Sequence, residues 1–495
     1  MPKVALPELA RARSLADHFA PRFLRDVGVF PFEAADRRPT LAMGDPMDRH
    51  ALKAAELALG AACEVVVASF EDIAAALGEQ GETARPAGPA EPGREENLDN
   101  LRDLASGAPV VRAVDDLIDK AMERRASDLH LEPARDGLVV RIRVDGLLRA
   151  LAAPLGVPPH ALISRIKIVS GLDIAERRLP QDGSARLRTA RGELDIRVAT
   201  MPTPHGESAV IRLLPRDRGL LDIKRLGMSE RDEKTLRRLI DQPHGLIIVT
   251  GPTGSGKTTT LATLLSELNQ PFRKILTIED PIEYELPGVA QSQVKPEIGL
   301  SFAAAMRAFL RHDPDVIMVG EVRDPETAAI AVHAALTGHL VLTTLHTETA
   351  AAAAARLIDL GVEPFLLRST LRAVVGQRLV RVLCERCRSP RRLTRADFDA
   401  DPRYAALGLE DGETLFEPKG CERCAGVGYR GRVGVFEALS VDSETRELIG
   451  STSDAGALEA AARRVGMTTM MDDAIAKCRA GVTSVAEALR VTTAP

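Results

Sequence analysis

The sequence contains no tryptophan, and aromatic residues make up only 3% of its 495 residues. A surface that stacks nucleic-acid bases needs aromatic side chains, so this scarcity argues against such a surface. The formal net charge of -5 gives no general attraction to nucleic acid either. We therefore expect no nucleic-acid partner.

Long apolar runs are also missing. No run is long enough to cross a bilayer, and the N-terminal stretch MPKVALPELARARSLADHF lacks the apolar core of a signal peptide. We expect a cytoplasmic protein without a membrane span, which contacts a membrane only through partners.

Cysteine is rare, and four of the six cysteines fall in two C-x-x-C pairs separated by 33 residues. Each pair can present two thiolates to one tetrahedral Zn²⁺, and a reducing compartment favours metal over disulfides. Redox dithiols are the alternative, although a redox pair does not need a second pair. The predicted zinc ligands are Cys384, Cys387, Cys421 and Cys424.

What the sequence does contain is a phosphate-binding motif in IIVTGPTGSGKTTTLATLL, between a strand-like run and a helical one. The spacing G-x-x-x-x-G-K-T wraps backbone N–H groups around phosphate. We expect Lys257 to reach the β- and γ-phosphates of ATP and Thr258 to bind Mg²⁺. A plain turn rich in Gly and Thr is the alternative. The predicted nucleotide-binding residues are Gly251, Pro252, Thr253, Gly254, Ser255, Gly256, Lys257, Thr258 and Thr259.

Carboxylates follow two other apolar strands. Glu321 ends DVIMVG, where it can hold Mg²⁺ or its water, and Glu279 and Glu283 lie in ILTIEDPIEYEL. A carboxylate that orients the attacking water accelerates hydrolysis by roughly 10²–10⁴-fold. His346 ends the strand HLVLTTL, where a γ-phosphate sensor could lie. Solvated loop acids and a core histidine are the alternatives.

Strands alternating with helices predict an α/β fold with a parallel sheet covered on both faces. Composition and period divide the chain into an N-terminal partner-docking domain, a linker, a mixed α/β domain, a second linker, an ATPase core, a zinc subdomain and a C-terminal helical region. Their predicted ranges are 1–78, 79–108, 109–216, 217–238, 239–383, 384–430 and 431–495.

Together these motifs resemble the secretion-superfamily ATPases, and within them the type II secretion ATPases (general secretory pathway protein E). The resemblance covers roughly residues 110–491 and includes RASDLHLEP, RLPQDGSARL, the phosphate loop, TIEDPIEYE, GEVRDPETA and TGHLVLTTLHT. The double C-x-x-C matches the assembly branch of the superfamily. Residues 1–77 are similar to the family's N-terminal domain only in placement.

The resemblance implies a RecA-like core in a homo-hexamer at the inner membrane, where the N-terminal domain docks on a platform protein. It implies ATP hydrolysis that drives pseudopilus assembly and protein export. It places the catalytic glutamate at Glu283, with Glu279 as the second candidate, and assigns Arg197 and Arg212 to the nucleotide. Without it, these two arginines could equally be solvent-facing strand residues. No cyclic-dinucleotide motif of the pilus type is visible near the N-terminus, so we expect no such regulator.

Three other functions stay open at this point. Pilus assembly uses related machinery, a nucleic-acid translocase can use the same core, and a nucleotide-binding scaffold would not turn over. Charge and aromatic content disfavour the translocase. Lys257, Glu283 and Glu321 disfavour the scaffold.

Overall fold

The computed structural model describes residues 105–492 except 190, 216–220 and 451–454, and residues 4–77 with gaps at 5, 10–11, 17–18, 20–23, 25–26, 35–37, 45, 47, 70–71 and 74–75. The chain forms two compact units, divided between Arg94 and Glu95. Most of the linker predicted at 79–108 lies outside the described residues. No helix among the described residues is long and apolar enough to cross a membrane.

The N-terminal unit is a small α/β fold around a sheet of order β1-β2-β3-β4, in which only β3 and β4 are parallel. Buried Phe30, Leu41 and Ala55 belong to its apolar clusters. Its elements are α1 (Leu6–Leu9), β1 (Arg13–Ser14), β2 (Val29–Glu33), β3 (Pro39–Met43), α3 (Arg49–Leu59) and β4 (Glu64–Val67).

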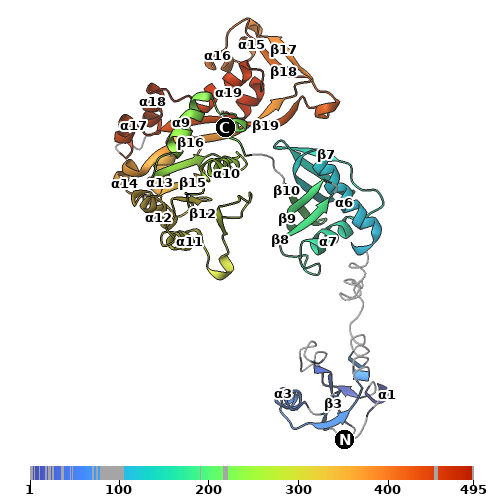
Figure 1. Ribbon diagram of the computed structural model, residues 1–495. Coiled ribbons are helices and arrows are strands. Elements are labelled where there is room, and N and C mark those ends of the chain that lie inside the picture. Colours follow the sequence, from blue (N-terminus) through green and yellow to red (C-terminus); the bar gives the residue numbers. More distant parts are fainter. Residues whose placement is uncertain are drawn as a thin grey trace. The chain divides into compact units, whose positions relative to one another are not determined.

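The second unit begins with an antiparallel sheet of order β7-β6-β5-β10-β9-β8. Helices α6 and α7 pack on one face of it (Figure 1), because alternate strand residues such as Leu194, Ile196 and Val198 are buried there. The elements are α6 (Ala108–Glu123), β5 (Ala126–Ala134), β6 (Gly137–Val144), β7 (Leu147–Leu151), α7 (Pro159–Val169), β8 (Gln181–Thr189), β9 (Gly192–Thr203) and β10 (Gly206–Pro215).

The core is a seven-stranded sheet of order β13-β12-β14-β15-β11-β16-β19, parallel except for β19. Alternate residues of β11 pack into different clusters: Leu246 and Ile248 into one, Ile247 and Val249 into the other. Helices therefore cover both faces, as the apolar strands predict. The elements are α8 (Ile223–Leu226), α9 (Glu230–Ile240), β11 (Gly245–Thr250), α10 (Lys257–Leu268), β12 (Ile275–Glu279), β13 (Ala290–Gln293), η2 (Pro296–Ile298), α11 (Phe302–Phe309), β14 (Val316–Val319), α12 (Pro325–Leu336), β15 (Leu340–Leu345), α13 (Ala350–Asp359), α14 (Pro364–Thr370), β16 (Leu371–Leu383) and β19 (Tyr429–Ser440).

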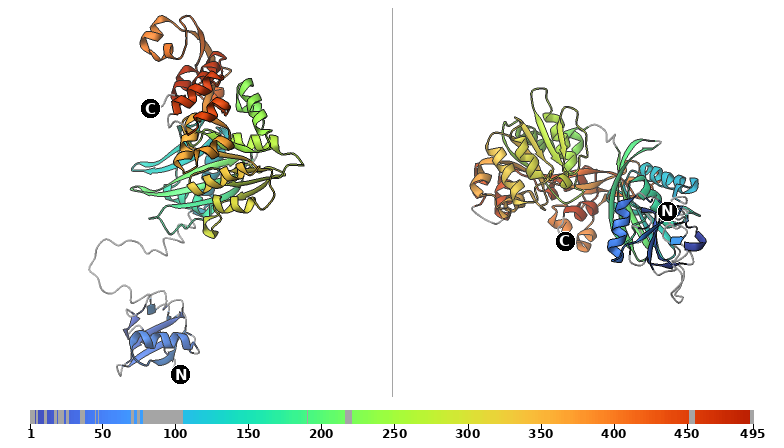
Figure 2. Two further views of the ribbon diagram at one scale, coloured as in Figure 1. Left: turned by 90° about the vertical axis from the view of Figure 1, so that its left-hand side faces the viewer. Right: turned by 90° about the horizontal axis from the view of Figure 1, so that it is seen from below.

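The cysteine-rich segment is inserted between β16 and β19, which pair with each other. Its strands pack against α19 through the apolar cluster that includes Leu393, Leu415 and Ile475 (Figure 2). Its elements are β17 (Arg388–Arg392), α15 (Arg395–Ala400), α16 (Arg403–Ala406), β18 (Thr414–Pro418) and η3 (Glu422–Cys424). The chain then ends in α17 (Ser443–Leu448), α18 (Ala455–Arg464), α19 (Met470–Arg479) and α20 (Val485–Thr492).

Two predicted segments differ from the structure. The C-terminal region predicted as helical from 431 begins with ten residues of β19, which complete the core sheet beside β16. The stretch predicted as a linker at 217–238 contains α8 and most of α9, and α9 buries Leu236 and Leu239 against the core. In both places the long-range packing partner decides the structure.

Candidate active site and metal centre

The phosphate loop connects β11 to α10. Gly251, Gly254 and Gly256 have φ values of 147°, 80° and 90°, which glycine adopts without strain. A Cβ atom on Gly251 would lie 2.3 Å from the carbonyl oxygen of Gln377, so a side chain there would clash with backbone. The loop thus has the conformation and the tight packing that only glycines allow.

Lys257 is the first residue of α10, and only 8% of it is exposed. Its Nζ donates to the carbonyl oxygens of Gly251 at 2.7 Å and Pro252 at 3.0 Å. Burial lowers the pKa of Lys257 to about 8, although the charge of Glu321 opposes this shift. The ammonium group is therefore held at the loop, where a phosphate would meet it.

A residue that the sequence gave no reason to select, Gln377 on β16, supports the loop. Its Nε2 donates to the carbonyl oxygen of Ser255 at 2.8 Å, and its Oε1 accepts from Thr260 Oγ1 at 2.7 Å. Gln377 is 2% exposed. It joins the loop and the first turn of α10 to a neighbouring strand, and no local spacing could reveal a contact over this distance.

Glu279 and Glu283 lie at the carboxyl end of β12. Glu279 is buried, and its Oε1 accepts from Thr277 Oγ1 at 2.8 Å and Gln291 Nε2 at 2.9 Å. Burial raises the pKa of Glu279. Glu283 lies in the following loop, which the hydroxyl of Tyr284 joins to Thr259 at 2.9 Å. This loop is therefore tied to the helix that carries Lys257.

Glu321 and His346 meet at the ends of neighbouring strands, β14 and β15. Glu321 Oε2 lies 3.3 Å from His346 Nε2, and its Oε1 lies 2.6 Å from Arg323 Nη2. Next to His346, the Thr347 hydroxyl lies 2.7 Å from that of Thr250, at the end of β11. The predicted Glu321 and His346 thus lie together at the edge of the sheet that carries the phosphate loop.

The donor set suits Mg²⁺ at this edge. The Glu321 carboxylate is close enough to Lys257 to raise its pKa, and Thr258 follows Lys257 directly. Carboxylate and hydroxyl oxygens are the ligands that Mg²⁺ takes beside phosphates. Thr258 and Glu321 are therefore the residues that would hold the ion.

The four paired cysteines converge, and their sulfur atoms lie within 4.8 Å of one another. Sγ–Sγ distances are 3.9 Å for Cys384–Cys421, 3.8 Å for Cys387–Cys424 and 3.7 Å for Cys421–Cys424. Four sulfurs bonded to one tetrahedral zinc ion at about 2.3 Å would lie about 3.8 Å apart. The residues present therefore fit a closed zinc site.

Backbone donors support the same cluster. The N–H groups of Cys421 and Gly428 lie 3.2 and 3.1 Å from Cys424 Sγ. Burial alone would raise the pKa of this thiol, but these donors lower it to about 6. Donors around a sulfur favour the thiolate, which is the form that binds metal.

Comparison with known proteins agrees with these sites. The type II/IV secretion system protein family matches residues 103–490, and the MshEN domain matches residues 1–86. The type II secretion system protein E of Xanthomonas campestris is 44% identical over 95% of this chain and 84% of its own length. The type II secretion system ATPase E of Vibrio cholerae is 46% identical, over 80% of this chain and 77% of its own. The chain belongs to the type II secretion ATPases.

Solved structures agree with this family. The pilus retraction motor PilT with bound ADP is 28% identical and covers 77% of this chain and 97% of its own, with a TM-score of 0.54. The ATPase DotB of Legionella pneumophila, at 24% identity and a TM-score of 0.55, shares the fold over 81% of this chain and 97% of its own. The predicted fold class, the ATPase activity and the type II secretion family are confirmed.

In this secretion ATPase the predicted arginines lie on the open face of the second sheet. Arg197 and Arg212 are cross-strand partners on β9 and β10. Arg212 Nε lies 3.1 Å from Asp128 Oδ1, and Arg143 Nε lies 3.8 Å from Asp128 Oδ2. Asp128, whose role the sequence did not reveal, fixes the direction of Arg212 from the adjacent strand β5.

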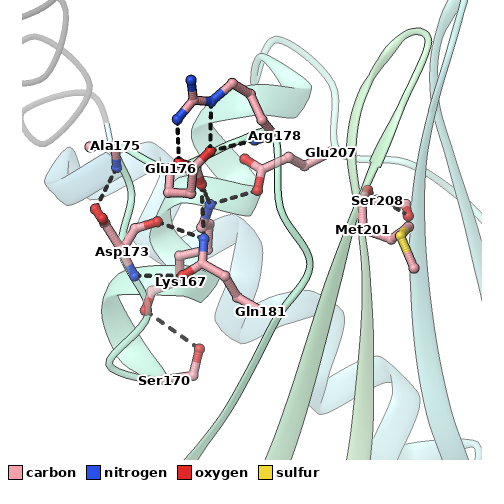
Figure 3. A network of polar contacts seen from close by, with 10 residues as sticks. All are labelled: Lys167, Ser170, Asp173, Ala175, Glu176, Arg178, Gln181, Met201, Glu207 and Ser208. Carbon is pink, nitrogen blue, oxygen red and sulfur yellow. Dashed lines mark hydrogen bonds and ion pairs between the residues drawn. The ribbon is translucent and has the colours of Figure 1, made fainter.

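Behind this sheet a fully buried lysine organises the loop of the RLPQDG motif (Figure 3). Lys167 Nζ lies 2.6 Å from Glu207 Oε1 and 2.6 Å from the carbonyl oxygen of Glu176. Gln181 closes the same loop through its hydrogen bonds to Asp173 and Glu176. The loop between α7 and β8 is thus fixed to β10, the strand that carries Arg212.

Proposed function

We propose that this secretion ATPase hydrolyses ATP at the carboxyl edge of its core sheet and works as a cytoplasmic homo-hexamer at the inner membrane. The observation that carries the proposal is the meeting of Lys257, Glu321 and His346, with the Glu283 loop tied to the same helix. These groups supply phosphate binding, metal binding and a base at one place.

We assign the roles as follows. Lys257 and the loop residues 251–259 bind the phosphates, and Thr258 and Glu321 hold Mg²⁺. Glu283 orients the attacking water, because the more deeply buried Glu279 already accepts two hydrogen bonds and its raised pKa favours the neutral form. His346 senses the γ-phosphate from its position against Glu321.

We assign Arg197 and Arg212 to the transferring phosphoryl group, whose charge a guanidinium stabilises well. They belong to a different sheet from Lys257, so the active site is complete only when the two domains close. Closure costs conformational freedom, and packing in a hexamer governs which domains meet. Isolated chains should therefore hydrolyse ATP slowly.

The remaining assignments rest on the family. We infer that the tetracysteine site holds one structural zinc ion and that the N-terminal domain docks on an inner-membrane platform protein. Hydrolysis then drives pseudopilus assembly and protein export. We also infer that no nucleic acid and no cyclic dinucleotide takes part.

Turnover per subunit, measured from dilute protein to a forced hexamer, tests the completed site. It should rise with hexamerisation, and Arg212→Ala should remove most of the gain while nucleotide affinity changes less. Arg191→Ala is the matched control, because this exposed arginine on the same domain pairs only with Glu123 among the described residues. Turnover that stays flat would show that the site is complete without neighbours, and stimulation by DNA would instead favour a translocase.

A further inference from the structure

A second charged cavity lies away from the phosphate loop. Its volume is about 830 Å³, within the range of cavities that hold small ligands. Four arginines line it, each from a different element: α9, α14, β16 and α17. They are Arg238, Arg368, Arg372 and Arg446.

The charge of this cavity is not balanced. Its two acidic lining residues are Asp442 and Glu447, which leaves a net positive charge of two. The Asp442 carboxylate already accepts from the backbone N–H and the hydroxyl of Thr445, both at 2.8 Å. Among the residues that the structure describes, no acidic side chain forms an ion pair with any of the four arginines.

Arg372 is the most confined of the four groups. Its Nη1 donates to the carbonyl oxygen of Ser369 at 2.8 Å, and burial together with the charge of Arg446 lowers its pKa. The start of β11 also makes room for it, since a Cβ atom on Gly245 would lie 2.4 Å from Arg372 Cγ. A guanidinium fixed beside a second one, without a counter-charge, is unfavourable unless an anion joins them.

The cavity is separate from the active site. Arg372 is the second residue of β16, whereas Gln377 supports the phosphate loop five residues later on the same strand. Five strand residues span about 17 Å. The two sites therefore lie towards opposite ends of the parallel strands, and ATP at the loop leaves the cavity accessible.

We propose that this cavity binds a soluble small molecule that carries at least two phosphate groups. Planar guanidinium groups pair with phosphate oxygens in a bidentate way, and arginines from four elements can surround a ligand with several such groups. No aromatic side chain lines the cavity, so the phosphates rather than a stacked base are recognised. This site goes beyond the proposed function and does not depend on it.

Inorganic tripolyphosphate is the probe, and calorimetry on the full-length chain is the measurement. The background is Lys257→Ala, so that the phosphate loop does not contribute the binding. Adding Arg372→Gln and Arg446→Gln together should weaken the affinity at least tenfold. Arg395→Gln is the matched control, because that exposed arginine lies in the cysteine-rich insertion, and it should leave the affinity unchanged.

Arg372→Gln with Arg446→Gln should keep the ATP turnover of the parent when Lys257 is present, which shows that the chain still folds. The proposal is wrong if Lys257→Ala protein does not bind tripolyphosphate, or if the arginine changes leave its affinity within twofold. It is also wrong if phosphatidylglycerol vesicles, and not tripolyphosphate, bind in a way that needs these arginines. That result would identify a lipid headgroup as the ligand.

Discussion

The phosphate loop and the tetracysteine site are built in different ways, although β16 contributes to both. The loop is held by residues far away in the sequence: Gln377 binds Ser255 and Thr260, and Thr250 binds Thr347. The cysteine cluster is held by short turns, with bonds such as Cys421 N–H to Cys424 Sγ. The fold itself therefore prepares the first site, whereas the second depends on its metal.

Metal removal should separate the two sites most strongly. Structural zinc contributes about 10–16 kcal/mol of apparent binding energy in zinc-finger peptides, and the insertion has few buried leucines of its own to replace it. Cys384→Ser should therefore unfold the insertion, detected by proteolysis and by loss of zinc in metal analysis. Cys63→Ser is the control, because Cys63 lies outside the cluster. Well-folded, metal-free wild-type protein from reducing buffer would contradict the zinc site.

Lys257→Ala should have the largest effect on catalysis and almost none on folding. Removing one stabilising group from a reaction centre costs about 10²–10³-fold in rate, and Lys257 also binds the ground-state phosphates, so we expect no measurable turnover. The melting temperature should stay close to that of the parent. A folded variant with near-normal turnover would refute the site.

Glu283→Gln should lower turnover by roughly 10²-fold or more, because the attacking water loses its base. ATP should still bind, as measured by calorimetry. The matched change is Glu279→Gln. If that change alone stops turnover while Glu283→Gln remains active, the roles of the two glutamates must be exchanged.

Gln377→Leu tests whether the sheet really holds the loop. It leaves the Ser255 carbonyl and the Thr260 hydroxyl without a partner, which should cost about 1–3 kcal/mol for each buried group. Both the free energy of unfolding and the ATP affinity should fall. Arg372→Gln on the same strand is the control, and an equal loss of ATP affinity there would point to the strand rather than to this contact.

The smallest effect should be a stabilising one. Burial raises the pKa of Glu279 above its ordinary value of 4.5, so above this pH the unfolded chain releases a proton that the folded chain retains. The wild-type stability therefore falls as the pH rises towards the folded pKa. Glu279→Gln should relieve this loss and keep both hydrogen bonds to Oε1, giving a modest gain in melting temperature at pH 7 and little at pH 4.

The sequence predicted those parts of the molecule whose signal is local. The phosphate loop, the cysteine pairs and the acids at strand ends are contiguous motifs with fixed spacing, and they predicted their own positions. Lys167 was missed because a lysine in PHALISRIKIV is expected on the surface, and only its pairing with Glu207 explains its burial. β19 was missed because the insertion of the cysteine-rich segment separates it from its partner strand.

That insertion has a consequence for how the family can vary. Because β16 and β19 pair in register from Ala373–Ser440 to Arg381–Arg432, the cysteine-rich segment is a module on the tip of a hairpin. A chain with a short turn in its place would keep the whole sheet and the phosphate loop. It would have to change only the apolar side of α19 and α20 that the module covers, including Ile475 and Leu489. A motor of this design can therefore gain or lose the metal module in evolution without rebuilding its engine.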